Sequence, residues 1–108
     1  MRKRLPKLGL KNIDIVVCNF VRFEKVIRKL TDFNIKNIDV GGPLMVRAAA
    51  TNFKHVLVII DPNDYGKVAK AILENKITDK FRQQLAAKAF KYTYFYDYQI
   101  AKYLEKNL

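Results

Sequence analysis

Two short runs of β-branched and other apolar residues, with helical sequence between them, constrain the fold of this chain more than any other feature. The runs are IDIVVCNF at residues 13–20 and HVLVIID at residues 55–61. Nearly continuous apolar strands are typical of parallel sheets covered on both faces. Parallel strands need a long crossover, usually a helix, and the intervening sequence provides one. We therefore predict an α/β fold with parallel strands at about 13–20 and 55–61, joined by a right-handed connection.

Two helices are predicted between the strands. Proline at a first helical position gives up an amide that has no intrahelical partner, so one helix is predicted to begin at Pro43 and to stop at Asn52. An earlier amphipathic helix is predicted over residues 22–30. Its apolar residues recur at i, i+3, i+4 and i+7 and are Phe23, Val26, Ile27 and Leu30.

Helical sequence continues after the second strand. Asp61 can cap a helix with Pro62 at its first position, and this helix is predicted to run to about Asn75. From residue 78 to about residue 104 the chain has good helix formers without Gly or Pro. This helical C-terminal region forms either one helix or two, with a break in the tyrosine-rich stretch 91–98. The predicted apolar face of the helix after Asp61 consists of Tyr65, Val68, Ala69 and Ile72.

Size and composition limit the chain to one domain or part of one. It has 108 residues, half of them hydrophobic, which is typical of a chain that packs a core. No apolar run approaches the roughly 20 residues of a membrane span, and the N-terminus lacks the features of a signal peptide. The single cysteine, Cys18, excludes an internal disulfide, and His55 has no other ligand at metal-binding spacing. We expect a cytoplasmic protein with no membrane partner and no metal.

The formal net charge of +11 allows an anionic partner such as nucleic acid or a nucleotide. The lysines are scattered, which favours solvated lysine-rich faces over a nucleic-acid surface. A small basic nucleic-acid-binding module stays open as an alternative. Aromatic residues near the C-terminus could stack bases, although packing or a subunit contact is the favoured interpretation. They are Phe90, Tyr92, Tyr94, Phe95, Tyr96, Tyr98 and Tyr103.

The segment NIDVGGP at residues 37–43 places the Asp39 carboxylate before flexible backbone and a helix start. Free amides at a helix N-terminus bind anions, and glycines let a ligand approach the backbone. Asp39 could therefore orient or deprotonate a substrate amide. Taken alone, these residues favour a structural interpretation, in which Asp39 complements the helix dipole and the glycines form a turn.

Cys18 and Asn19 follow the first strand, at the edge where open α/β sheets bind ligands. The alternatives are a buried Cys18 acting as a small apolar residue and an Asn19 that ends the strand through a bond to the backbone. Catalysis by a Cys18 nucleophile has little support, because no histidine lies nearby in the sequence.

Three blocks, taken in order, resemble the cyclohydrolase domain of the bifunctional purine-synthesis enzyme AICAR formyltransferase/IMP cyclohydrolase. They are IDIVVCNF, NIDVGGPLMVRAAATNFKHVLVIIDPNDY and the stretch from FRQQLAAKAF to YDYQIAKYL. The resemblance implies that residues 1–108 are the C-terminal portion of a methylglyoxal-synthase-like, three-layer domain, without its front half and without the formyltransferase domain. It also implies a hydrolase that binds the purine nucleotides FAICAR and IMP and uses no cofactor.

The resemblance also assigns site residues by position. Cys18 and Asn19 match the family's strand-end pair near the substrate. Asp39, Val40 and Gly41 match the acidic loop beside the reacting carboxamide, and Asp39 is the matching catalytic group.

Two catalytic positions differ from the family pattern, because Val21 replaces a tyrosine and Thr51 replaces a lysine. Ring closure needs a group that takes the carboxamide proton and donors for the formyl oxygen. With Asp39 present and both donors lost, the resemblance implies a fragment that is catalytically impaired alone. A split active cyclohydrolase with a separately encoded front half stays open, as does a homodimer or another partner polypeptide.

Overall fold

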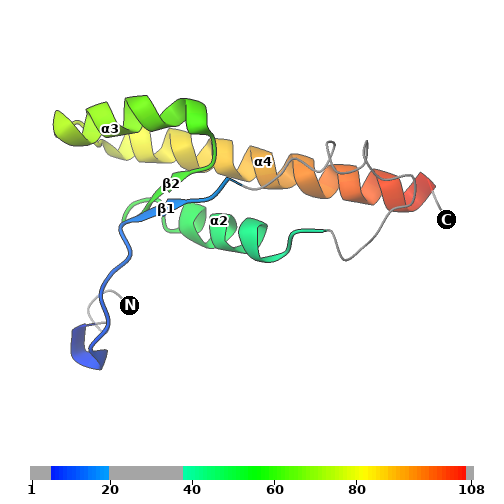
Figure 1. Cartoon of the computed structure of the whole chain (residues 1–108), viewed down its shortest axis with the longest axis horizontal. Helices are drawn as coiled ribbons and strands as arrows, with labels where there is room; N and C mark the ends of the chain where they lie inside the picture. The colour runs from blue at the N-terminus through cyan, green and yellow to red at the C-terminus, as the bar shows by residue number, and fades with distance from the viewer. Residues whose placement is uncertain (1–5, 20–37, 107–108) are drawn as a thin grey trace.

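The computed structural model describes residues 6–19 and 38–106. Figure 1 shows the short strands beside α2 and α4. The predicted helix at 22–30 lies outside the described residues. The elements are the 3-10 helix η1 (Pro6–Leu8), strand β1 (Ile15–Val17), helix α2 (Gly41–Thr51), strand β2 (Leu57–Ile59), the 3-10 helix η3 (Pro62–Asp64), helix α3 (Tyr65–Leu73) and helix α4 (Asp79–Lys106).

β1 and β2 pair in parallel, which confirms the predicted α/β class. Each strand has three residues and is shorter than the predicted ranges 13–20 and 55–61. Backbone bonds from Leu57 to Asp14 and from Cys18 to Ile59 extend the ladder slightly beyond the strands. The paired residues are Ile15 with Leu57, Val16 with Val58 and Val17 with Ile59.

The expectation that the first strand is covered on both faces is wrong. Ile15 is 44% exposed and Val17 is 53% exposed, whereas Val16 between them packs against the core. Alternate residues of a strand face opposite sides, so the described residues cover only one face of β1. β2 differs, since all three of its residues are buried and both α2 and α4 contact it.

α2 begins at Gly41, two residues before the predicted start at Pro43. Pro43 lies in the first turn, where the amide that it lacks would have no intrahelical partner, so it does not prevent the earlier start. Asn52 caps the C-terminus, as predicted. Small side chains allow α2 to pack closely against α4 and β2. The buried residues of α2 are Pro43, Val46, Ala49 and Ala50.

The Asp61 side chain caps the next helical segment, as predicted, but the first turn is the 3-10 helix η3. α3 then ends at Leu73, two residues before the predicted end at Asn75. The predicted apolar face is only partly correct, because Tyr65, Ala69 and Ile72 are exposed. The buried residues lie at i, i+4 and i+7, and the first of them is charged. They are Asp64, Val68 and Ala71.

α4 is a single helix of 28 residues, without a break in the tyrosine-rich stretch. The Thr78 hydroxyl accepts a hydrogen bond from the Phe81 amide at 3.1 Å and caps the N-terminus. Burial of one face outweighs the weak helix propensity of the aromatic stretch. Long as α4 is, no helix in the described ranges is also apolar enough to cross a membrane. The buried residues of α4 are Leu85, Ala86, Ala89, Thr93 and Tyr96.

Candidate functional site

Two of the predicted site residues meet where β1 ends and α2 begins. The Cys18 amide donates to the Ile59 carbonyl at 2.9 Å, which holds the residue directly after β1 against β2. The Cys18 sulfur lies 3.9 Å from the carbonyl oxygen of Gly42, in the first turn of α2. The end of the strand and the start of the helix therefore form one continuous surface, and Asp39 belongs to it.

Asp39 is held by two different helices. Its Oδ1 accepts a hydrogen bond from the Gly42 amide at 3.0 Å, which satisfies one of the first amides of α2. Its own amide donates to the phenol oxygen of Tyr96, on α4, at 2.7 Å. The backbone and the side chain of Asp39 are thus fixed independently.

The geometry around Asp39 requires glycine at position 42. A Cβ at Gly42 would lie 2.6 Å from Oδ2 of Asp39, whereas a Cβ at Gly41 would meet no atom within 4 Å. Val40 and Gly41 are exposed beside the carboxylate, and Asn19 is exposed next to Cys18.

The N-terminus of α2 is not an open anion site. Asp39 already binds the Gly42 amide, and Pro43 has no amide to donate. The carboxylate also places a negative charge at the positive end of the helix dipole, where a phosphate would be repelled. The structural interpretation of Asp39 therefore describes the observed contacts, and anion binding at this helix end is not supported.

The environment of Cys18 does not suit a nucleophile. Burial, and after it the charge of Asp39, raises the pKa of the Cys18 thiol above its usual value. The thiolate is the reactive form, so a raised pKa leaves less of it at neutral pH. Cys18 instead packs as a small, half-buried residue against the core.

Thr51 does not join this surface. It is the last residue of α2, and its hydroxyl donates to the Arg47 carbonyl one turn earlier, at 2.8 Å. Asp39 precedes the other end of the same helix, so about 15 Å of helix separates the two residues at roughly 1.5 Å per residue. Val21, the second substituted position, lies outside the described residues.

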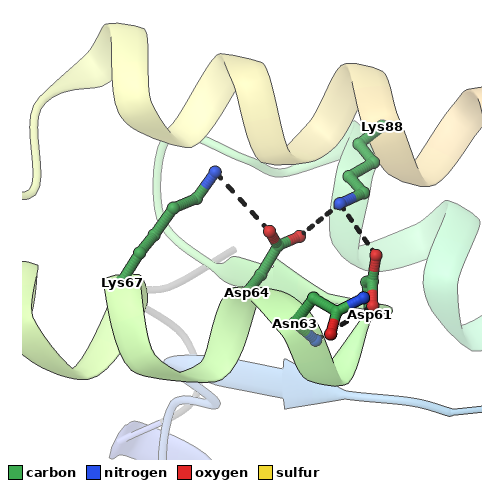
Figure 2. A network of polar contacts seen from close by, with 5 residues as sticks. All are labelled: Asp61, Asn63, Asp64, Lys67 and Lys88. Atoms are coloured by element: carbon green, nitrogen blue, oxygen red, sulfur yellow. Dashed lines mark hydrogen bonds and ion pairs between the residues drawn. The ribbon is translucent and has the colours of Figure 1, made fainter.

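A cluster of charged side chains that the sequence did not predict joins η3 to α4 (Figure 2). Lys88 Nζ lies 2.8 Å from Oδ2 of Asp64 and 3.0 Å from Oδ2 of Asp61. Lys67 lies 3.6 Å from Oδ1 of Asp64, which is only 6% exposed. A buried carboxylate is costly unless it is paired, so Lys88 stabilises the attachment of η3. Hydrogen bonds to Asp64, and then to Asp61, raise the pKa of Lys88.

Signals for these missed contacts exist in the sequence. Lys88 interrupts a run of alanines whose helical spacing places Ala89 in the core, and Tyr96 lies seven residues after Ala89 on the same face. Periodicity could therefore mark both positions, but it could not name partners that lie far away in the sequence. No group of three His, Cys, Asp or Glu side chains in residues 6–19 and 38–106 could hold a metal ion.

Comparison with known proteins identifies the family. The family model described as the AICARFT/IMPCHase bienzyme matches residues 49–108, more than half of the chain. The chain belongs to this family. The matched segment includes β2, the Lys88 cluster and Tyr96, and the resemblance found in the sequence is confirmed.

Members of the AICARFT/IMPCHase family from several bacteria are similar along almost the whole chain. The bifunctional purine biosynthesis protein PurH of Persephonella marina is 46% identical over 108 residues, which are 97% of this chain and 21% of the relative. PurH of Caldicellulosiruptor saccharolyticus is 48% identical over 107 residues, which are 95% of this chain and 21% of the relative. These matches extend through the Asp39 loop. The chain spans about a fifth of the length of these relatives.

A solved structure in this comparison supports the fold. The crystal structure of ForH matches with a TM-score of 0.74 and 31% sequence identity, over 92% of this chain and 54% of that chain. The arrangement of strands and helices agrees with the partial methylglyoxal-synthase-like domain that the resemblance implies.

Proposed function

We propose that this chain acts in purine biosynthesis as the C-terminal portion of an IMP cyclohydrolase domain. In this proposal it binds formamidoimidazole carboxamide ribotide when the front half of the domain is supplied, and ring closure gives IMP. Family membership and the names of the relatives support the pathway. The single observation that supports the site is Asp39, fixed where β1 meets α2.

Asp39 is the proposed general base. In the proposed reaction the carboxamide nitrogen attacks the formyl carbon, a proton leaves that nitrogen and water is lost. Since Oδ1 of Asp39 is bound to Gly42, Oδ2 is the oxygen proposed to take the proton. Cys18, Asn19, Val40 and Gly41 are the proposed substrate-binding residues beside it. The open space at Gly41 would let a planar ring approach the backbone.

We further propose that ring closure by this chain is slow. Removal of one preorganised donor to a developing oxyanion costs roughly 10²–10³ in rate, and both positions that resemble the family's donors have lost them. Val21 has no hydrogen-bonding side chain. The Thr51 hydroxyl is short and already donates within its own helix.

The test joins this chain to the front half of a cyclohydrolase domain. The chain is fused to the front half of the cyclohydrolase domain of PurH from Persephonella marina, and IMP formation from the formylated ribotide is followed by ultraviolet absorbance. We expect feeble turnover. Val21→Tyr and Thr51→Lys together should raise turnover well beyond either change alone, because groups that act as one unit are not additive. Thr51 is at the far end of α2 from Asp39, so this expectation requires the longer lysine side chain to extend from there towards the bound ribotide.

Two further variants test the assignment of Asp39. Asp39→Asn in the doubly restored fusion should abolish the gain, whereas Asp79→Asn, which removes a carboxylate from the exposed start of α4, should leave turnover unchanged. Brisk turnover by the unmodified fusion would contradict the impairment, and unchanged turnover after Asp39→Asn would contradict the base.

A further inference from the structure

Among the tyrosines of α4, Tyr96 is the buried one. Tyr96 is only 5% exposed, whereas Tyr94 is 68% exposed, and Tyr96 belongs to the hydrophobic core that includes residues of β2 and α2. A buried phenol oxygen needs a hydrogen-bonding partner, and this one accepts the Asp39 amide at 2.7 Å. The bond joins residues that are 57 positions apart in the sequence.

The contact fixes the part of the Asp39 loop that α2 does not fix. The Gly42 amide holds the carboxylate, but a side chain can rotate with its backbone unless the backbone is held as well. Tyr96 is buried on α4, which packs against α2, so the surrounding core holds its oxygen in place. Together the two bonds define the position of Asp39 Oδ2.

We infer that Tyr96 is a positioning residue for Asp39, which holds the carboxylate at the orientation that proton transfer requires. This inference rests on the proposed function, because it concerns the same site. Tyr96 acts through the backbone of Asp39 and is given no contact with substrate. Geometry of this kind matters to the rate, because a misplacement of about 1 Å can cost roughly 100-fold.

The charge state of Tyr96 supports the assignment. Burial raises the pKa of its hydroxyl above the usual value, and the nearby charge of Asp39 acts in the same direction, while the hydrogen bond from the Asp39 backbone acts in the opposite direction. The phenol is therefore neutral across the physiological range. A neutral hydroxyl accepts the Asp39 amide without placing a second negative charge beside the carboxylate.

The first experiment requires no activity. Amide hydrogen exchange is measured by NMR in the fusion to the front half, in its Tyr96→Phe variant and in the matched control Tyr94→Phe, which removes an exposed hydroxyl from the same helix. Loss of one hydrogen bond corresponds to about a fivefold change, so Tyr96→Phe should speed exchange at Asp39 by at least about fivefold. Exchange at Val58 in β2 should stay within about twofold in both variants, which separates a local effect from a loss of folding.

The second experiment uses the fusion that carries Val21→Tyr and Thr51→Lys. Tyr96→Phe should lower kcat about tenfold, by the same reasoning about misplacement, and leave KM for the formylated ribotide within about twofold. Tyr94→Phe should change neither constant.

The two experiments separate the possible failures. If the restored fusion forms no IMP, the proposed function fails, and the exchange rates still decide whether Tyr96 holds the loop. Unchanged exchange at Asp39 in Tyr96→Phe would overturn the inference. A loss of kcat in Tyr96→Phe that comes with faster exchange at Val58 and throughout the fold would also overturn it. That result would show that Tyr96 acts only as a core residue.

Discussion

At position 42 the backbone has room for a hydrogen atom and nothing larger, because Oδ2 of Asp39 occupies the place of a side chain. Gly41→Ala should raise the free energy of unfolding by about 0.4–1 kcal/mol, since it restricts the unfolded chain without a clash. Gly42→Ala restricts the unfolded chain in the same way, but its Cβ displaces the Asp39 carboxylate. The hydrogen bond from the amide of residue 42 to Asp39 is then lost, and such a capping bond is typically worth about 1 kcal/mol. Urea unfolding should therefore rank Gly41→Ala above Gly42→Ala, and equal stabilities would contradict the clash.

Cys18 provides a second test at the residue scale. Because burial and the charge of Asp39 raise its thiol pKa, Cys18 should react with iodoacetamide more slowly at pH 8 than a free cysteine does. Asp39→Asn should speed the reaction only in part, because burial of the thiol is a larger cause of its raised pKa than the charge of Asp39. The variant should therefore still react more slowly than a fully exposed cysteine. The rate measured against pH gives the thiol pKa directly, and an unshifted curve would show that Cys18 is not shielded.

Among the elements, the attachment of η3 to α4 depends on Lys88. Lys88→Met leaves the buried Asp64 carboxylate with Lys67 at 3.6 Å, and should lower the free energy of unfolding by about 1–2 kcal/mol once the partial exposure of Lys88 is considered. Lys91→Met, at an exposed position three residues later, is the matched control and should change it by less than about 0.5 kcal/mol.

The pH dependence of the Lys88 contribution follows from the direction of its shift. The pKa of Lys88 is raised in the folded state. The stabilisation by its charge is therefore fully present below the unfolded pKa of about 10.4, and it is lost as the pH rises through the folded pKa. The stability difference between the wild type and Lys88→Met should therefore shrink above about pH 10.4. A difference that grew with pH would assign the effect of Lys88 to something other than its charge.

Element type could be predicted from the sequence wherever one strong local signal acted alone. The apolar run 55–61 gave β2, and Asp61 before Pro62 gave the cap. The buried faces of the helices depended on tertiary contacts. The buried face of α3 includes Asp64 and not Tyr65, and core packing keeps α4 helical across the stretch 91–98, which has weak helix propensity. At the candidate site, chain order predicted that Cys18 follows the first strand and that Asp39 precedes a helix. The contact with Tyr96 could not be predicted, because sequence spacing does not reveal a partner 57 positions away.

At the scale of the whole molecule, the uncovered face of β1 predicts how the 108-residue chain behaves alone. Ile15 and Val17 present apolar side chains on the face that no described element covers, and short sheets with uncovered faces are marginal in water. We expect concentration-dependent association and a broad melt. Ile15→Lys with Val17→Lys should reduce association, as measured by size-exclusion chromatography, because charges on exposed strands oppose pairing between chains. A sharp monomeric melt in the unmodified chain would contradict this expectation.

The hydrogen bond between Asp39 and Tyr96 also dictates when the site can exist during synthesis. Its two residues are 57 positions apart, and ribosomes add roughly 5–20 residues per second, so about 3–11 seconds pass between them. Through that interval the nascent chain holds an acidic loop without its anchor on α4. The Asp39 loop can therefore adopt its fully held position only after the Tyr96 part of α4 has been made and has folded against it.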